Sequence, residues 1–353
     1  MIASTDASAP ADAAAGVRPV ASREGVLELS EPLSLFFGAT LERVRIAWRI
    51  TGDTGPVVAA LGGISAGRCV ANLPNAEGAD AKGWWGDIVG PGGALDTSRC
   101  QVLGFDFLGG SGLTTGPQRG QADFPSISAY DQAEVLRLLL SHLGIDRLEM
   151  IVGASYGGMV ALAFAERFPE RVGHIVVISA ADRSHPLSTA WRSVQRAMVR
   201  YASKNGDGPE GLRLARALAM ATYRSSSEFE ARFSGEPVQV DGRFQFPVEN
   251  YLLARGDAYA ASYIPEAFVC LSESIDLHRV SAAKITTPST LVAVREDQLV
   301  PLADMQSMHS HLGGPSELIA ISSLYGHDAF LKEVATLRSV FAAGLRSAGG
   351  HRG

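Results

Sequence analysis

The sequence predicts an α/β fold in which a mostly parallel sheet is flanked by helices and an inserted helical lid interrupts the core. Short apolar segments of strand length, such as 57–61 and 148–152, alternate with amphipathic segments of helix length in the first half of the chain. This alternation stops between about 182 and 284 and resumes after it. We therefore expect one sheet assembled from two parts of the chain.

The first part of the core contains both kinds of strand signal. Residues 43–51 alternate apolar and polar side chains, as a half-buried strand does. Residues 128–144 predict a helix, because Ser128 can cap its first turn. A second helix is expected from 156 to 168, where Pro169 ends it. Continuous apolar runs typical of strands covered on both faces occur at 57–61, 101–107, 148–152 and 174–179.

The second half supplies the lid and the rest of the core. Helical stretches at 190–201 and 208–223 and an irregular stretch at 233–246 belong to the lid. A closing helix from 329 to about 345 follows expected strands at 288–294 and 317–321. The expected organisation is a flexible tail at 1–25, core at 26–181, helical lid at 182–284, core at 285–346 and a flexible tail at 347–353.

Composition excludes several classes of function. The 353 residues are 46 % hydrophobic and 19 % charged, with a net charge of −6, so we expect a globular protein without nucleic acid as a partner. No apolar run reaches the roughly 20 residues of a membrane span, and the N-terminus lacks the pattern of a secretory signal. Cys69, Cys100 and Cys270 have no CxxC spacing, which disfavours a metal site or a disulfide framework and indicates a reducing compartment.

The most informative short motif is Gly153-Ala154-Ser155-Tyr156-Gly157, which joins an apolar strand to a helix. This is the context that a G-x-S-x-G nucleophile elbow requires. Its glycines let backbones approach closely, and the helix N-terminus offers free N–H groups. Ser155 is therefore the candidate nucleophile. The alternative is a glycine-rich strand–helix junction without a catalytic role.

A serine nucleophile needs a general base and an acid that orients it. In this architecture the acid and then the histidine follow the serine along the chain. Asp297 comes just after the strand expected to end at 294, and His327 comes just after the one expected to end at 321. We predict them as acid and base. The rival acid is Glu296, and the rival histidines are His174, His309 and His311.

A tetrahedral intermediate also needs backbone N–H donors for its oxyanion. One is expected from Tyr156, next to the nucleophile. The second is expected from Gly63 or Ile64, in the loop after the 57–61 strand. The alternative for this loop is a plain tight turn.

Longer motifs around these residues resemble one family. In order they are Gly83-Trp84-Trp85, Gly90-Pro91-Gly92, Leu95-Asp96-Thr97, Thr114-Thr115-Gly116-Pro117 after Gly109, Asp123-Phe124-Pro125 and Tyr325-Gly326-His327-Asp328-Ala329-Phe330-Leu331. The sequence resembles the homoserine O-acyltransferase family of the α/β-hydrolase superfamily over roughly 35–345. WW-x(4)-GPG and YGHDAFL are its most specific motifs.

The resemblance implies transfer of an acyl group from acetyl-CoA or succinyl-CoA to homoserine, in methionine biosynthesis, by a cytoplasmic homodimer. Acyl-CoA is then a co-substrate, and no metal or other cofactor is implied. It also implies that Arg216 binds the amino acid's carboxylate and that Asp328 binds its α-ammonium. The alternatives are a solvated helix residue for Arg216 and a helix cap for Asp328.

Leu61-Gly62-Gly63-Ile64-Ser65 departs from the family's usual loop, so the donor and the acceptor stay open. Arg68 or Arg295 would serve a succinyl group, whereas Gln298-Leu299-Val300 after the acid favours acetyl. Alternative functions are a serine O-acyltransferase of cysteine biosynthesis, an esterase with the same triad, and a non-catalytic binding protein.

Overall fold

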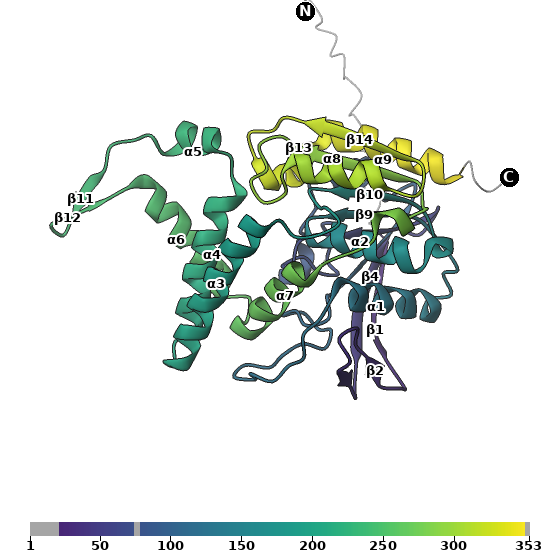
Figure 1. Cartoon of the computed structure of the whole chain (residues 1–353), viewed down its shortest axis with the longest axis horizontal. Helices are drawn as coiled ribbons and strands as arrows, with labels where there is room; N and C mark the ends of the chain where they lie inside the picture. The colour runs from purple at the N-terminus through teal and green to yellow at the C-terminus, as the bar shows by residue number, and fades with distance from the viewer. Residues whose placement is uncertain (1–20, 74–77, 350–353) are drawn as a thin grey trace, which may run out of the picture.

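An eight-stranded, mostly parallel sheet forms the centre of the computed structural model, which describes residues 21–73 and 78–349 (Figure 1). The first three strands in the sheet order pair antiparallel, and every later pair is parallel. The predicted fold class is confirmed. The sheet order is β1 (Ser22–Glu28), β4 (Arg45–Thr51), β8 (Gln101–Phe105), β5 (Val57–Leu61), β9 (Leu148–Ala154), β10 (Val172–Ile178), β13 (Ser289–Val294) and β14 (Ser316–Ile321).

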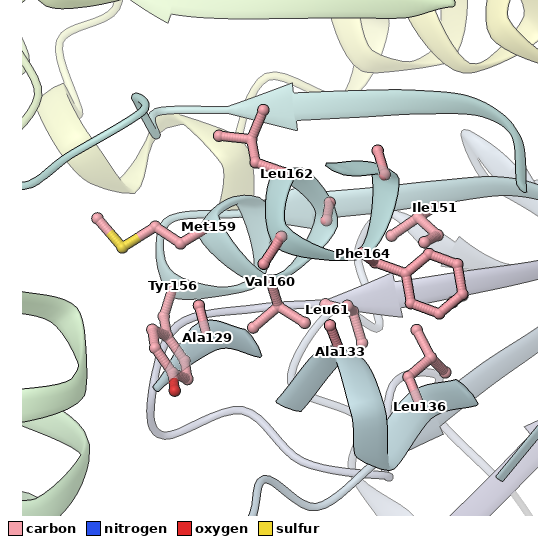
Figure 2. Packing of buried hydrophobic residues seen from close by; sticks show 14 of the residues in the cluster. Leu61, Ala129, Ala133, Leu136, Ile151, Tyr156, Met159, Val160, Leu162 and Phe164 are labelled. Carbon is pink, nitrogen blue, oxygen red and sulfur yellow. The ribbon is translucent and has the colours of Figure 1, made fainter. Parts of the chain in front are cut away.

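Helices cover both faces of the sheet because its central strands are apolar on both sides. In β9, Ile151 packs into the cluster that includes α1 (Ala129–His142) and α2 (Tyr156–Arg167), whereas Met150 packs with α9 (Val334–Gly349). Side chains of α2 gather with those of α1 over the first face (Figure 2). Helix α8 (Leu302–His311) adds to that face beside β13 and β14.

The chain between β10 and β13 forms a group of helices that projects to one side of the sheet (Figure 1). A hydrophobic cluster that includes Leu212, Tyr259 and Tyr263 joins these helices. The stretch 233–246, expected to be irregular, contains a two-stranded hairpin instead. The elements are α3 (Pro186–Lys204), α4 (Gly208–Tyr223), α5 (Ser226–Phe233), β11 (Val238–Val240), β12 (Arg243–Gln245), α6 (Pro247–Ala260) and α7 (Pro265–Leu277).

Both ends of the ordered chain differ from expectation. Strand β1 begins at Ser22, inside the expected 1–25 tail, and pairs with β4 along its whole length. Its side chains are mostly exposed, so no apolar run marks it. The closing helix begins at Val334 rather than 329, because a separate turn holds Gly326–Leu331, and it runs to Gly349. The remaining parts of both expected tails lie outside the described residues.

Short elements complete the structure. They are β2 (Leu33–Ser34), β3 (Thr40–Leu41), β6 (Val89–Gly90), β7 (Leu95–Asp96) and the 3₁₀ turns η1 (Gly78–Ala81), η2 (Pro169–Arg171), η3 (Ala282–Lys284) and η4 (Gly326–Leu331).

Candidate active site

Ser155 lies on a strained turn between β9 and α2. Its backbone has φ 55° and ψ −121°, a conformation that costs a non-glycine residue about 1–3 kcal/mol. The flanking glycines make the turn possible: a Cβ on Gly153 would lie 2.2 Å from the Gly157 carbonyl oxygen, and one on Gly157 would lie 2.2 Å from the Leu61 carbonyl oxygen. The turn presents the serine hydroxyl at the end of the strand.

Three predicted residues meet at this turn through two hydrogen bonds. Ser155 Oγ is 2.8 Å from His327 Nε2, and His327 Nδ1 is 2.7 Å from Asp297 Oδ2. The second carboxylate oxygen of Asp297 accepts the N–H groups of Leu299 and Val300 at 2.8 and 3.0 Å. The carboxylate is thus fixed, and it orients the imidazole toward the serine.

The rival residues make other contacts. Glu296 accepts the N–H of Ser323 at 2.8 Å. Among the rival histidines, Nε2 of His174 is 2.9 Å from Thr290 Oγ1, and His309 and His311 contact carbonyl oxygens of Ser316 and Ser307. The geometry therefore favours Asp297 and His327.

Electrostatics around His327 favour a proton on its ring. Burial lowers the pKa of His327, but the charge and hydrogen bond of Asp297, together with the charge of Asp328, raise it, and the net shift is upward from 6.5. The surroundings of His327 therefore favour its protonated imidazolium form.

The predicted oxyanion donors lie beside the nucleophile. Tyr156 is the first residue of α2, where a backbone N–H has no partner within the helix. Its phenol is buried and bonded to Ser274 Oγ at 2.6 Å, so the side chain is directed away from the reaction. Gly157 N–H donates to Gly62 O at 2.8 Å, which joins the loop that carries Gly63 to the elbow.

A pocket opens at Ser155 and His327 between the core and the lid. Ile64, in the loop after β5, and Tyr223, the last residue of α4, line it. Helices α3 and α7 form its far wall. An acyl chain on Ser155 would occupy this space.

The two residues predicted to bind the amino acid, Arg216 and Asp328, have different kinds of neighbour: aromatic rings surround Arg216, and an arginine pairs with Asp328. The Arg216 guanidinium stacks over the rings of Tyr223 and Tyr259, with centroids at 5.3 and 4.8 Å. Asp328 is 8 % exposed and forms an ion pair with Arg224 at 3.3 Å. Burial raises the pKa of Asp328, and the charges of Arg224, His327 and Arg216 oppose that shift. Sequence reasoning missed Arg224, which directly follows Tyr223.

The two arginines named for a succinyl group do not line this pocket. Arg68 Nη1 is 3.0 Å from the buried carboxylate of Asp106, which holds it elsewhere. Arg295 is exposed at the end of β13. Instead, Arg183 and Arg192 line the pocket. No motif pointed to them, because the packing of the lid brings them there.

Other features of the described residues bear on cofactors and membranes. In 21–73 and 78–349, no group of three or more His, Cys, Asp or Glu side chains is arranged to hold a metal ion. The three cysteines are free thiols. Within that same part of the chain, no helix combines the length and apolarity needed to cross a membrane.

The fold and the serine–histidine–aspartate geometry define an α/β-hydrolase-fold protein, and residues 73–334 match the family model described as alpha/beta hydrolase fold. Homoserine O-succinyltransferase of Xanthomonas campestris pv. campestris is 40 % identical over 87 % of this chain and 80 % of its own length. Homoserine O-acetyltransferase of Thermobifida fusca is 34 % identical over 87 % of this chain and 90 % of its own. The chain therefore belongs to the homoserine O-acyltransferase family.

Solved structures agree on the fold. Homoserine O-acetyltransferase from Bacillus anthracis superposes with a TM-score of 0.83 at 19 % identity, covering 93 % of this chain and 98 % of the other. Esterase E22 superposes with a TM-score of 0.82 at 22 % identity, covering 92 % and 100 %. Because an acyltransferase and an esterase share this scaffold, the fold alone does not define the acyl acceptor.

Proposed function

We propose that this protein transfers an acyl group from acyl-CoA to the hydroxyl of L-homoserine in two steps through an acyl-serine intermediate. The observation that carries the proposal is the hydrogen-bonded chain from Ser155 through His327 to Asp297, with distances of 2.8 and 2.7 Å. The similarity to named homoserine O-acyltransferases supports homoserine as the acceptor.

In the first step, Ser155 Oγ attacks the thioester carbonyl while His327 Nε2 takes its proton. The N–H groups of Tyr156 and of Gly63 or Ile64 stabilise the oxyanion. The C–S bond then breaks, and the departing CoA sulfur receives the proton from His327. The acyl group remains as an ester on Ser155.

In the second step, homoserine replaces CoA. Its hydroxyl gives its proton to His327 and attacks the ester, and the proton then returns to Ser155 Oγ. Asp328 holds the α-ammonium of homoserine and Arg216 holds its carboxylate. The aromatic faces of Tyr223 and Tyr259 fix the Arg216 guanidinium, which limits the entropy it loses on binding.

The same proposal includes the wider setting that the family resemblance implies. The product is an intermediate of methionine biosynthesis in the cytoplasm, acyl-CoA is the co-substrate without a further cofactor, and the working unit is a homodimer. Light scattering of the purified chain tests the dimer: a molar mass of one chain at micromolar concentration would contradict it.

Intact-mass spectrometry tests the mechanism. Wild-type protein mixed with acyl-CoA without homoserine is expected to gain one acyl group, located on Ser155. Ser155→Ala is expected to gain none and to lose transfer by several orders of magnitude. Adding homoserine, serine or buffer to the acylated enzyme then identifies the acceptor. Faster deacylation by serine, or by water as in an esterase, would contradict homoserine as the acceptor.

A further inference from the structure

A cluster of buried charges lies behind the pocket, where α3 packs against α7. Asp276 binds Arg192 through Oδ1 at 2.7 Å and Arg196 through Oδ2 at 2.6 Å. The side chains of Arg192, Asp276 and Arg196 are 12 %, 9 % and 10 % exposed. The two arginines lower the pKa of Asp276 and outweigh the effect of burial, so the carboxyl is ionised. Two guanidinium groups share one carboxylate, and one positive charge is left unbalanced within the cluster.

This surplus charge faces the catalytic pocket. Arg192 lines the same pocket as Ser155 and His327, whereas Arg196 does not line it and instead donates to Ser272. The charge of Arg192 lowers the pKa of His327, which places the guanidinium within electrostatic reach of the base. An unbalanced charge among buried groups is costly, and an anion bound in the pocket would offset that cost.

Two neighbours in the pocket wall add to the case for an anion. Arg183 also lines the pocket, and its partner Asp182 lies 3.5 Å away. Ser179 is 1 % exposed, has φ 50°, and its hydroxyl has no hydrogen-bond partner. A strained serine with an unused donor is consistent with a ligand contact. Among the described residues that line the pocket, Asp304 carries the one carboxylate, whereas Arg183 and Arg192 carry two positive charges.

We propose that Arg192, assisted by Arg183 and the Ser179 hydroxyl, forms a subsite for a carboxylate at the far end of the acyl group. The preferred donor is then a dicarboxylic acyl-CoA of the succinyl type rather than acetyl-CoA. This inference rests on the proposed function, because it requires the acyl group to be carried on Ser155. It replaces Arg68 and Arg295 as the residues that would recognise a succinyl group.

The test compares three donors in the acylation step, measured as CoA release without homoserine. Butyryl-CoA carries a methyl group where succinyl-CoA carries its carboxylate, so it separates charge from chain length. For the wild type, the second-order rate constant of acylation, taken from the single-turnover burst of CoA, is expected to be at least tenfold higher with succinyl-CoA than with butyryl-CoA or acetyl-CoA. Arg192→Met leaves Asp276 paired with Arg196, and it is expected to lower the succinyl-to-butyryl ratio at least tenfold.

Two further variants separate recognition from folding. Arg196→Met removes the surplus charge and leaves Arg192 in the pocket wall, and it also removes the donor to Ser272, which lines the pocket. It is expected to lower the same ratio at least threefold. Arg200→Met, on the same helix with a 55 % exposed side chain, is the matched control and should leave the ratio unchanged. If Arg192→Met does not fold, Arg196→Met provides the test: an unchanged succinyl-to-butyryl ratio in that variant overturns the carboxylate subsite.

The outcomes distinguish this inference from the proposed function. A wild type that prefers acetyl-CoA, or an Arg192→Met variant that loses all three donors equally, overturns the carboxylate subsite and leaves acyl transfer intact. So does an Arg192→Met variant whose donor ratio is unchanged while its KM for homoserine, measured in the complete reaction, rises. Absence of CoA release from every donor overturns the proposed function itself.

Discussion

Trp85 Nε1 donates a hydrogen bond to the carbonyl oxygen of Phe330 at 2.8 Å and joins segments 245 residues apart. Phe330 lies three residues after His327, in the same 3₁₀ turn. The Trp85 ring is 1 % exposed and packs edge-on against Phe330 and Phe341, with centroids at 6.4 and 5.8 Å. The two most specific sequence motifs therefore touch, and one supports the turn that carries the proposed base.

Trp85→Phe removes the donor and leaves a buried carbonyl oxygen without its partner, which typically costs about 1–3 kcal/mol. We expect the free energy of unfolding to fall by at least that amount and kcat to fall with it, because the His327 turn loses its support. Trp48→Phe is the matched control, since the buried Trp48 Nε1 has no hydrogen-bond partner to lose. Equal destabilisation by both variants would assign the effect to ring volume instead.

The upward pKa shift of His327 predicts a specific pH dependence. The base must be neutral to accept the serine proton, so activity rises with pH through its pKa. The acid limb of kcat/KM is therefore expected above pH 6.5 in the wild type. Asp297→Asn removes the main group that raises this pKa and should move the limb to lower pH, besides lowering kcat. A limb that stays in place would show that another group titrates.

Asp328 is expected to act on the acceptor and not on the donor. Asp328→Asn should raise the KM for homoserine at least tenfold while CoA release without homoserine changes by less than about threefold. Glu134→Gln is the control, because Glu134 pairs with Arg137 on α1 and does not line the pocket. Loss of CoA release in Asp328→Asn would instead make Asp328 part of the His327 relay.

Local patterns predicted the core strands and brought together Ser155, His327 and Asp297, which the structure joins by hydrogen bonds, for a physical reason. Strands covered on both faces must be apolar throughout, so 148–152 and 57–61 stand out in the sequence. The elbow is a local motif, and Asp297 and His327 each follow a strand at the same edge of the sheet. The sequence does not predict strand β1, and the expected core begins only at 26, because this edge strand is mostly exposed and has no apolar run.

The pocket cations could not be predicted in this way. The position of Arg68 shortly after Ile64 suggests a cation for a succinyl group. In the structure Arg68 pairs with Asp106 instead, and nothing in the local sequence of either residue indicates that ion pair. Arg192 enters the pocket because α3 packs on α7, where the Arg196–Asp276 contact spans 80 residues. Such contacts depend on the tertiary arrangement of the lid.

The lid also contacts the loop expected to supply the second oxyanion donor. Tyr263 Oη donates to the carbonyl oxygen of Ile64 at 2.9 Å, and Tyr259, stacked on Tyr263, lies 3.2 Å from Ser65 Oγ through its hydroxyl. Since Tyr259 also carries the stacked Arg216, the arginine proposed to bind the acceptor and the loop proposed to supply an oxyanion donor share one support.

Tyr263→Phe keeps the ring and removes only the hydroxyl that holds the Ile64 carbonyl. Loss of a whole oxyanion donor costs about 10²–10³ in kcat, so loss of its positioning is expected to lower kcat about tenfold. The KM for homoserine should change little, because the Arg216 stack on Tyr259 remains. Tyr201→Phe, with a 74 % exposed ring, is the control and should behave as the wild type. A raised KM with unchanged kcat would show that the loop serves acceptor binding and not the oxyanion.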